Sequence, residues 1–237
     1  MGWNLLSYKK KVSSSSHLEG YEPELANDEQ VETWWAAQTG NAGEWLQIDL
    51  GKTMEVNAIQ VNFDEYGANQ KGAVSGVYQS YLIYASVNGE DWSLVVDYGT
   101  KKTDTPHDYI EFEEPFKARY IKLQNKEYMV SENFSVRDLR IFGKGQGSTP
   151  RAVNDFTVER DEADPCKARL CWEAVPDAQG YIVRYGIAGD KLYNNFQVMG
   201  ENTLEIGSLN KGVAYYFTID AYNENGITRT SRIKVCR

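Results

Sequence analysis

The sequence is poor in the residues that most often carry chemistry in proteins. Its 237 residues include three cysteines and two histidines. Cys166, Cys171 and Cys236 are odd in number and lack a Cys-x-x-Cys spacing, so they predict neither a disulfide framework nor a metal site. His17 and His107 stand outside any metal-binding or nucleophile motif. We therefore expect three free thiols and no catalytic residue of these types.

Charge and hydropathy argue against further classes. No apolar run is long enough to span a membrane. The net charge of −9, with a pI near 4.9, disfavours nucleic acid or anionic lipid as a general partner. No glycine-rich phosphate loop is present. The adjacent Glu113 and Glu114 would point to opposite faces of a strand, which is poor placement for an acid and base pair. We therefore expect no enzymatic activity in this chain.

What is present suffices for two cores. Apolar residues make up 41% of the chain and aromatic residues 13%, including 16 tyrosines. The length suits two domains. The stretch GKGQGSTP at 143–150 has the composition of a linker. We place a first domain at residues 1–145 and a second at 151–237.

Apolar residues alternate with a period of two and are interrupted by Gly, Asn-Gly or Pro, which predicts an all-β protein. In the first domain we expect strands at 45–50, 55–63, 80–87, 93–98, 108–113, 118–125 and 136–142. In the second we expect strands at 155–160, 167–174, 180–186, 192–198, 203–207, 213–222 and 228–235. Helical periodicity is absent.

The connections of the first domain differ in length. Antiparallel strands place successive connections at alternate ends of a sandwich. Four long segments then meet at one end, which we call the long-loop end: 34–44, 64–79, 99–107 and 126–135. Loops on a rigid scaffold often serve recognition, and aromatic rings there can stack on a sugar while polar groups bind its hydroxyls. The candidate carbohydrate-binding residues are Trp34, Tyr66, Tyr78, His107 and Tyr128.

The tryptophans have different expected roles. Trp45 opens one alternating strand and Trp172 lies in another, so we expect both in a core. Trp92 follows an Asn-Gly turn and should pack under that hairpin. The adjacent Trp34 and Trp35 should face opposite ways in an extended chain. Trp34 either packs against a neighbouring loop or faces a ligand.

The first domain contains six segments in a fixed order: VSSSS (12–16), ANDEQVETWW (26–35), EWLQIDLGK (44–52), YASVNGEDW (84–92), FKARYIKL (116–123) and VRDLRIFG (136–143). Together they resemble the discoidin-like, coagulation-factor C-type domain, also found as family 32 carbohydrate-binding modules. The resemblance covers residues 12–143. It implies a jelly-roll β-sandwich in which Trp35 is structural.

The second half contains ARLCW (168–172) and LNKGVAYYFTIDAYNENG (209–226). These segments resemble strands of a fibronectin type III domain, with Tyr215 at the tyrosine-corner position. The resemblance implies a smaller β-sandwich, which we expect to be a spacer. GWNLLSYKK near the N-terminus and VRYGIAGDKLYNNFQV (183–198) resemble C-terminal accessory regions of bacterial family 43 glycoside hydrolases. That likeness implies a parent enzyme that acts outside the cytoplasm.

The segment YEPELANDEQVET (21–33) holds five carboxylates. Calcium takes about six to eight oxygen ligands, backbone carbonyls included. At this place the discoidin-like resemblance implies a structural calcium loop. The implied ligands are Asp28, Thr33, backbone oxygens near Ala26 and Gln30, and Asp138. The alternative is a solvated acidic loop without a metal.

Two functions remain. The first is a non-catalytic carbohydrate-binding accessory region that targets an extracytoplasmic glycoside hydrolase to a polysaccharide. The second is an architectural module that buttresses the parent catalytic domain and binds no sugar. Protein or lipid recognition is disfavoured, since residues 1–147 hold 14 Lys and Arg against 22 Asp and Glu. We expect a monomer whose partners are a glycan and an upstream catalytic domain.

Overall fold

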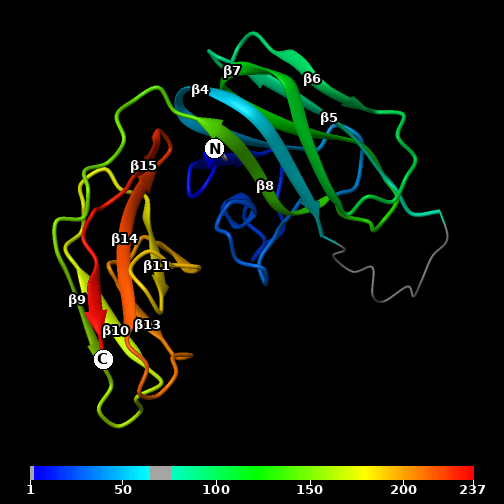
Figure 1. Ribbon diagram of the computed structural model, residues 1–237. Helices are drawn as coiled ribbons and strands as arrows, with labels where there is room; N and C mark the ends of the chain where they lie inside the picture. The colour runs from blue at the N-terminus through cyan, green and yellow to red at the C-terminus, as the bar shows by residue number, and fades with distance from the viewer. Residues whose placement is uncertain (1–2, 65–75) are drawn as a thin grey trace. The chain divides into compact units, whose positions relative to one another are not determined.

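The computed structural model describes residues 3–64 and 76–237 (Figure 1). Strands form the regular structure of these residues, apart from one short 3-10 helix, η1, at Pro23–Ala26. The all-β prediction is therefore confirmed. The chain divides into two compact units, residues 1–146 and 147–237. Within the described ranges, no helix has the length and apolar character needed to cross a membrane.

The first unit is a discoidin-type jelly-roll sandwich built from eight antiparallel strands. The strands are β1 (Asn4–Leu5), β2 (Lys11–Ser14), β3 (Trp35–Ala36), β4 (Trp45–Phe63), β5 (Gln79–Ser86), β6 (Ser93–Tyr98), β7 (His107–Tyr128) and β8 (Ser135–Lys144). Their order is β1-β8-β4-β7-β5-β6, with β2 paired to β4 and β3 paired to β8. The strand ends around β3, β5 and β8 position the long segments.

The two longest strands correct the expected strand pattern. β4 and β7 pair along nearly their whole length and curve together (Figure 1). The connections expected at 51–54 and 114–117 are therefore not turns. They are irregularities inside the strands, where the register shifts and extra residues are taken up as bulges. Gly51, with φ of +84°, marks the first of them.

Strand alternation fills the core of the first unit. In β4, Leu46 and Ile48 are fully buried, so Trp45 falls on the opposite face and is half-buried. The expectation that Trp45 is a core residue is therefore wrong. Trp35 is fully buried and meets the ring of Phe134 edge to face, with 5.7 Å between the centroids. Its structural role is confirmed.

The second unit has two sheets around a separate core. One sheet has the order β13-β10-β9, and the other has the order β12-β11-β14-β15 with β16 paired to β14. The strands are β9 (Phe156–Arg160), β10 (Ala168–Trp172), β11 (Gly180–Gly186), β12 (Asn194–Met199), β13 (Thr203–Ile206), β14 (Tyr215–Asn223), β15 (Gly226–Thr228) and β16 (Lys234–Cys236). The single strand expected at 228–235 is instead two short strands.

The core of the second unit contains the residues expected there. Trp172 is 5% exposed and packs edge to face on Tyr181. The hydroxyl of Tyr215 accepts a hydrogen bond from the backbone N–H of Asn210 at 3.2 Å. The three thiols are free, and Cys171 lies half-buried on the side of β10 away from the core.

Candidate functional site

Hydrogen bonds join the described parts of the four long segments. The side chain of Asn133 donates to the carbonyls of Ala37 and Gln38, both at 3.0 Å. The side chain of Asn125 donates to the carbonyl of Gly40 at 2.8 Å. Such bonds fix irregular backbone that has no sheet partner. The long-loop end is therefore a single hydrogen-bonded surface.

The segment 34–44 is also fastened at its base. The carboxylate of Glu44 accepts hydrogen bonds from Ser15, from Ser16 at 2.8 Å and from Thr39 at 2.8 Å. Burial raises the pKa of Glu44, but the hydrogen bonds from Ser15, Thr39 and Ser16 together outweigh it, so the pKa lies below its usual range. Glu44 is thus a charged anchor of the loop.

Tyr128 is a core residue, which corrects the sequence-based expectation. Its side chain is 6% exposed. The ring packs against Phe63 and Phe134, with centroid distances of 6.1 and 5.3 Å. Its hydroxyl donates to the carbonyl of Asp64. A ring enclosed in this way cannot stack on a sugar, so Tyr128 supports the loops from below.

Trp34 packs against its own domain. Its ring lies 5.2 Å from that of Tyr21, and the guanidinium of Arg137 lies 5.8 Å from its centroid. Arg137 also donates to the carbonyl of Val31 and pairs with Asp64. The indole Nε1 of Trp34 is buried and has no hydrogen-bond partner. These contacts favour packing over a ligand-facing role.

Tyr78 remains on the surface of the long-loop end, whereas Tyr66 lies outside the described residues. The ammonium of Lys102 lies 5.1 Å from the ring centroid of Tyr78 and 3.6 Å from the carboxylate of Glu127. The hydroxyl of Tyr78 and the ammonium of Lys102 hold the pKa of Glu127 below its usual range. An aromatic ring, a cation and a carboxylate therefore meet here.

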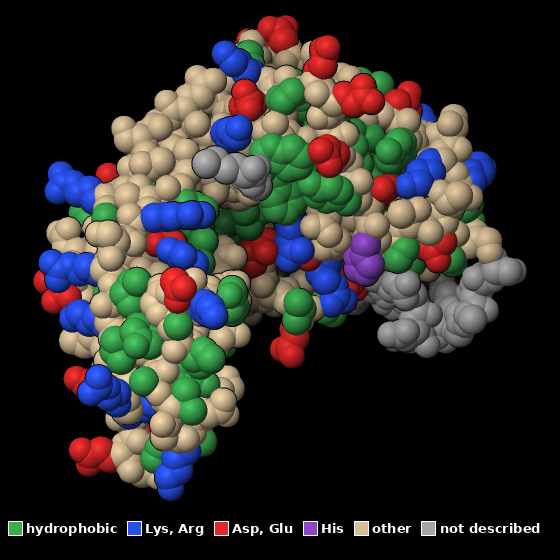
Figure 2. Space-filling view, in the orientation of Figure 1, with side chains coloured by type: hydrophobic (Ala, Val, Ile, Leu, Met, Phe, Trp, Pro, Cys, Tyr) green, Lys and Arg blue, Asp and Glu red, His purple; other side chains and the backbone are tan. Residues whose placement is uncertain are grey.

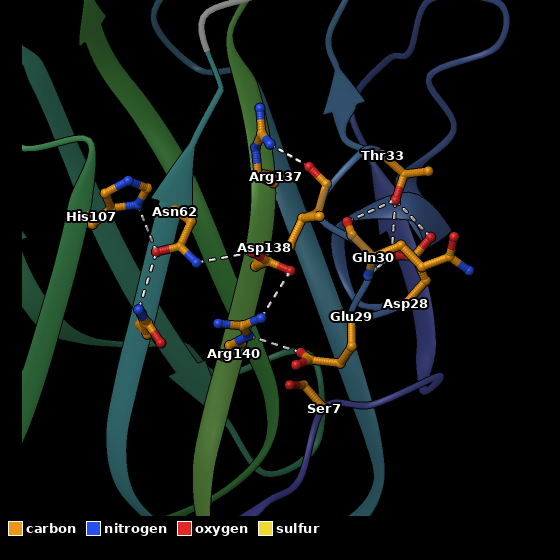
Figure 3. A network of polar contacts seen from close by, with 12 residues as sticks. Ser7, Asp28, Glu29, Gln30, Thr33, Asn62, His107, Arg137, Asp138 and Arg140 are labelled. Carbon is orange, nitrogen blue, oxygen red and sulfur yellow. Dashed lines mark hydrogen bonds and ion pairs between the residues drawn. The ribbon is translucent and has the colours of Figure 1, made fainter. Parts of the chain in front are cut away.

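His107 is exposed and is oriented by a row of polar side chains across β7, β4 and β8 (Figure 3). Asn62 donates through Nδ2 to the carboxylate of Asp138 at 2.9 Å, so its Oδ1 is an acceptor. That oxygen lies 3.2 Å from Nδ1 of His107. The proton of a neutral His107 therefore belongs on Nδ1, which leaves Nε2 as an acceptor for a ligand hydroxyl.

Oxygen atoms converge in the acidic loop before Trp34. The hydroxyl of Thr33 lies 3.0 and 2.9 Å from the two carboxylate oxygens of Asp28, and 3.1 Å from the carbonyl of Gln30. One hydroxyl can donate only one hydrogen bond. The remaining close oxygen contacts are those that a hard cation would stabilise. Oxygen atoms of the kind that calcium prefers therefore lie close together in this loop.

The carboxylate of Asp138 accepts a hydrogen bond from Asn62 on one oxygen, while the other, Oδ1, is buried without a hydrogen-bond partner. Asp138 is 3% exposed and lies 3.6 Å from the guanidinium of Arg140 (Figure 3). Arg140 in turn pairs with Glu29 at 2.9 Å. The loop is thus tied to β8 by an arginine, and the described residues contain no cluster of three His, Cys, Asp or Glu that could hold a metal. Ala26, whose carbonyl was an expected ligand, is fully buried.

Several residues of the site were missed by sequence reasoning. Asp64 joins Tyr128 and Arg137, and Arg140 joins Asp138 and the acidic loop. Single charged residues among apolar strands form no repeating pattern, so the sequence did not indicate that Asp64 and Arg140 join distant segments. Acidic and basic side chains are interspersed over the surface seen in Figure 2. Charge recognition must therefore come from local groups and not from a general field.

The comparisons with known proteins match the first unit. A family model described as F5/8 type C domain matches residues 11–138. Lactadherin of Rattus norvegicus is 35% identical over 95 residues, which are 38% of this chain and 21% of that protein. Neuropilin-1a of Danio rerio is 27% identical over 215 residues, which are 80% of this chain and 23% of that protein. The chain thus spans less than a quarter of these relatives.

Two solved structures share the fold. They are chitosan-binding modules 1 and 2 derived from a chitosanase/glucanase of Paenibacillus sp. IK-5, the second in complex with chitotriose. Each has a TM-score of 0.50. The identities are 23% and 22%, and the matches cover 59% and 58% of this chain and 99% of each module. At these identities the likeness concerns the fold.

Proposed function

This chain belongs to the F5/8 type C domain family through residues 11–138, and from that premise we propose that its first unit is a non-catalytic carbohydrate-binding module. The observation that carries the proposal is the long-loop end itself, where a hydrogen-bonded scaffold presents Tyr78 and His107 at the surface. Pre-organised loops lower the entropy cost of binding a flexible ligand.

The chemistry of this surface suits a neutral or weakly polar sugar. The ring of Tyr78 offers an apolar surface, and Nε2 of His107 can accept a hydrogen bond from a sugar hydroxyl. Lys102 and Glu127 add a donor and an acceptor beside the ring. An open site of this size buries little area, so we expect affinities of about micromolar to millimolar.

The proposal extends to the setting of the chain. The likeness of GWNLLSYKK and residues 183–198 to accessory regions of family 43 glycoside hydrolases supports a parent enzyme acting outside the cytoplasm. Two solved modules of the same fold come from a chitosanase/glucanase, which agrees with this setting. The second unit then serves as a fibronectin type III-like spacer between functional parts.

Calcium is part of the proposal. Asp28, Thr33 and the carbonyl of Gln30 would hold it. Three acceptor oxygens of Asp28 and Gln30 lie close to the hydroxyl of Thr33, which has only one proton to donate. The ion would neutralise the acidic loop and fix the backbone that leads into Trp34. Asp138 is not among the proposed ligands, since Asn62 donates to one of its oxygens and the guanidinium of Arg140 lies 3.6 Å from the other.

An architectural role is the second candidate, and one observation favours it. Two of the expected stacking residues, Trp34 and Tyr128, pack inside the first unit instead of facing a ligand. In that case the long-loop end would contact the parent catalytic domain. The sugar-binding proposal remains the better supported, because His107 is exposed and Tyr78 is only partly buried.

A glycan-array screen of the whole chain, followed by titration calorimetry with the best ligand, tests the proposal. Tyr78→Ala and His107→Ala should each weaken binding about tenfold or more, by analogy with other aromatic and hydrogen-bonding contacts. Tyr193→Ala is the matched control, since this tyrosine is 78% exposed and lies in the second unit. No binding on the array would favour the architectural role. Binding that survives both site variants would place the sugar elsewhere.

A further inference from the structure

The outer face of the first unit carries aromatic side chains that its core does not use. In β4, β5 and β7, residues that alternate with the buried ones point to this face. The strand ladder brings them together, since Gln47 lies opposite Lys122 and Lys122 lies opposite Tyr84. We call this surface the aromatic face. Its half-buried members are Trp45, Gln47, Tyr84, Trp92, Tyr120 and Lys122.

Trp92 shows that this face is more than a support for the hairpin. Its indole Nε1 donates to the carbonyl of Gly89 at 3.2 Å, so it packs against the turn as expected. Its ring is nevertheless outside the buried core and lies 6.4 Å from that of Tyr120. Grouped aromatic side chains on a surface, unlike single ones, mark interaction sites.

Lys122 lies among these rings without an acceptor. Its ammonium is 4.0 Å from the ring centroid of Trp92 and 5.5 Å from that of Tyr84. Within the described part of the chain it makes neither a hydrogen bond nor an ion pair. Burial lowers the pKa of Lys122, as it does for a cation that has lost water. Three N–H donors therefore lack the oxygen atoms that a ligand would supply.

The carboxylate next to Lys122 on the ladder does not fill this need. Asp49 lies opposite Tyr120 and accepts two hydrogen bonds from Arg119, at 2.8 and 2.9 Å. The guanidinium of Arg119 also lies 4.9 Å from the ring of Tyr120. This pair is complete by itself. Lys122, at the centre of the aromatic face, contacts the rings of Trp92 and Tyr84 but has no anionic partner among the described residues.

We propose that the aromatic face is a second saccharide-binding surface, which takes an acidic polysaccharide with a uronate carboxylate on Lys122. The carboxylate supplies the missing acceptors, and the C–H surfaces of the pyranose lie against Trp92 and Tyr84. The amide of Gln47, opposite Lys122, is placed to bind a neighbouring hydroxyl. The surface shares no residue with the long-loop site, so either can exist without the other.

Titration of the whole chain with polygalacturonate tests the inference, with fully methyl-esterified polygalacturonate as the neutral counterpart. We expect binding of the acid and not of the ester. Lys122→Met removes the charge but keeps the aliphatic stem, and it should weaken binding about tenfold or more. Lys126→Met is the matched control on the same strand, where the side chain is exposed, and it should change affinity less than about twofold.

A second variant tests the role of Lys122 without removing Lys122 or any aromatic residue, so a folding defect in Lys122→Met would not decide the result. Gln47→Glu places a carboxylate opposite Lys122, and this internal partner should displace the ligand while every aromatic residue remains. Tyr78→Ala should leave polygalacturonate binding unchanged, which separates this surface from the proposed long-loop site. Equal losses in the two lysine variants, equal competition by dextran sulfate or polyglutamate, or absence of binding to the acid would each overturn the inference.

Discussion

The long-loop end and the aromatic face use aromatic residues in opposite ways. At the long-loop end, Phe134 comes from an irregular segment, yet it is 1% exposed and packs against Trp35 and Tyr128 beneath the loops. On the aromatic face, Trp45 and Trp92 come from a strand and a tight turn, yet they remain outside the core. Membership of a loop therefore does not make a ring available, and membership of a strand does not bury it.

The difference follows from what each backbone needs. Irregular segments lack a ladder, so their side chains must supply both hydrogen bonds, as Asn133 does, and packing, as Phe134 does. A strand satisfies its backbone through its neighbours and has one face free. Residues such as Tyr84 can then remain on the surface at little cost to stability.

The largest effect should separate two tyrosines. Tyr128→Ala leaves a cavity among Phe63 and Phe134, so we expect a loss of about 3 to 5 kcal/mol in the free energy of unfolding. Tyr84→Ala should cost well under half of that. Urea denaturation followed by tryptophan fluorescence reports mainly on the first unit, which holds five of the six tryptophans. Similar losses for the two variants would break the comparison.

Calcium binding should depend on the acidic loop that contains Asp28 and not on Asp138. Free calcium at a hundredfold excess over its dissociation constant would stabilise the first unit by about 2.7 kcal/mol. Asp28→Ala should remove the response, while Asp138→Asn should keep it, because Asn62 and Arg140 engage Asp138. Thermal melts with calcium and with a chelator measure the difference. An identical midpoint in both conditions would remove calcium from the proposal.

The pH dependence of stability should differ between Glu44, at the long-loop end, and Asp49, beside the aromatic face. The folded pKa values of Glu44 and Asp49 both lie below the ordinary values of 4.5 and 3.8. Their contributions to stability are therefore present above those ordinary values and are lost as the pH falls through the folded ones. Glu44→Ala removes three hydrogen bonds and should cost about 1 to 3 kcal/mol at pH 7.

Asp49→Asn should cost less, because Arg119 is 39% exposed and water screens the pair. Unfolding free energies measured from pH 7 to pH 3 would show the gap between wild type and each variant closing in acid. A gap that stays constant with pH would mean that the charge of the carboxylate is not what holds the loop.

The smallest effect concerns His107. Because its ring is exposed, His107→Ala should change the free energy of unfolding by less than about 0.5 kcal/mol while weakening glycan binding. Asn62→Ala, in contrast, removes a buried partner of Asp138 and should be clearly destabilising. If His107→Ala proves equally destabilising, the histidine is a structural member of the polar row and not a free ligand group.

Much of the fold could be predicted from the sequence. Alternation located the longer strands, because burial of one sheet face imposes a period of two, but it missed the short strands β1, β2 and β3. The expected turns at 51–54 and 114–117 were wrong because glycine and proline also occur at bulges. The two errors lie next to each other on the paired strands β4 and β7, which curve together, so the long segments still meet at one end.

The site was harder to predict than the fold. Contacts such as those of Arg140 with Asp138 and Glu29 join residues far apart in the chain, and no local pattern encodes them. Trp45 was predicted on the wrong face of its strand. Alternate residues of a strand face opposite sides, and the more apolar of the two sets faces the core. Leu46 and Ile48 belong to the buried set, so Trp45 lies on the other face.

The pairing of β1 with β8 bears on how the protein is made. Asn4 lies opposite Gly143, so β1 cannot pair with β8 until nearly the whole unit has been synthesised. The long β4–β7 ladder likewise joins segments separated by some sixty residues. The β5–β6 hairpin is local, but the sandwich cannot close before β8 is made, so its apolar faces stay uncovered on the nascent chain. Such a domain is expected to fold slowly and only after β8 emerges, which leaves time for chaperones to bind it during translation.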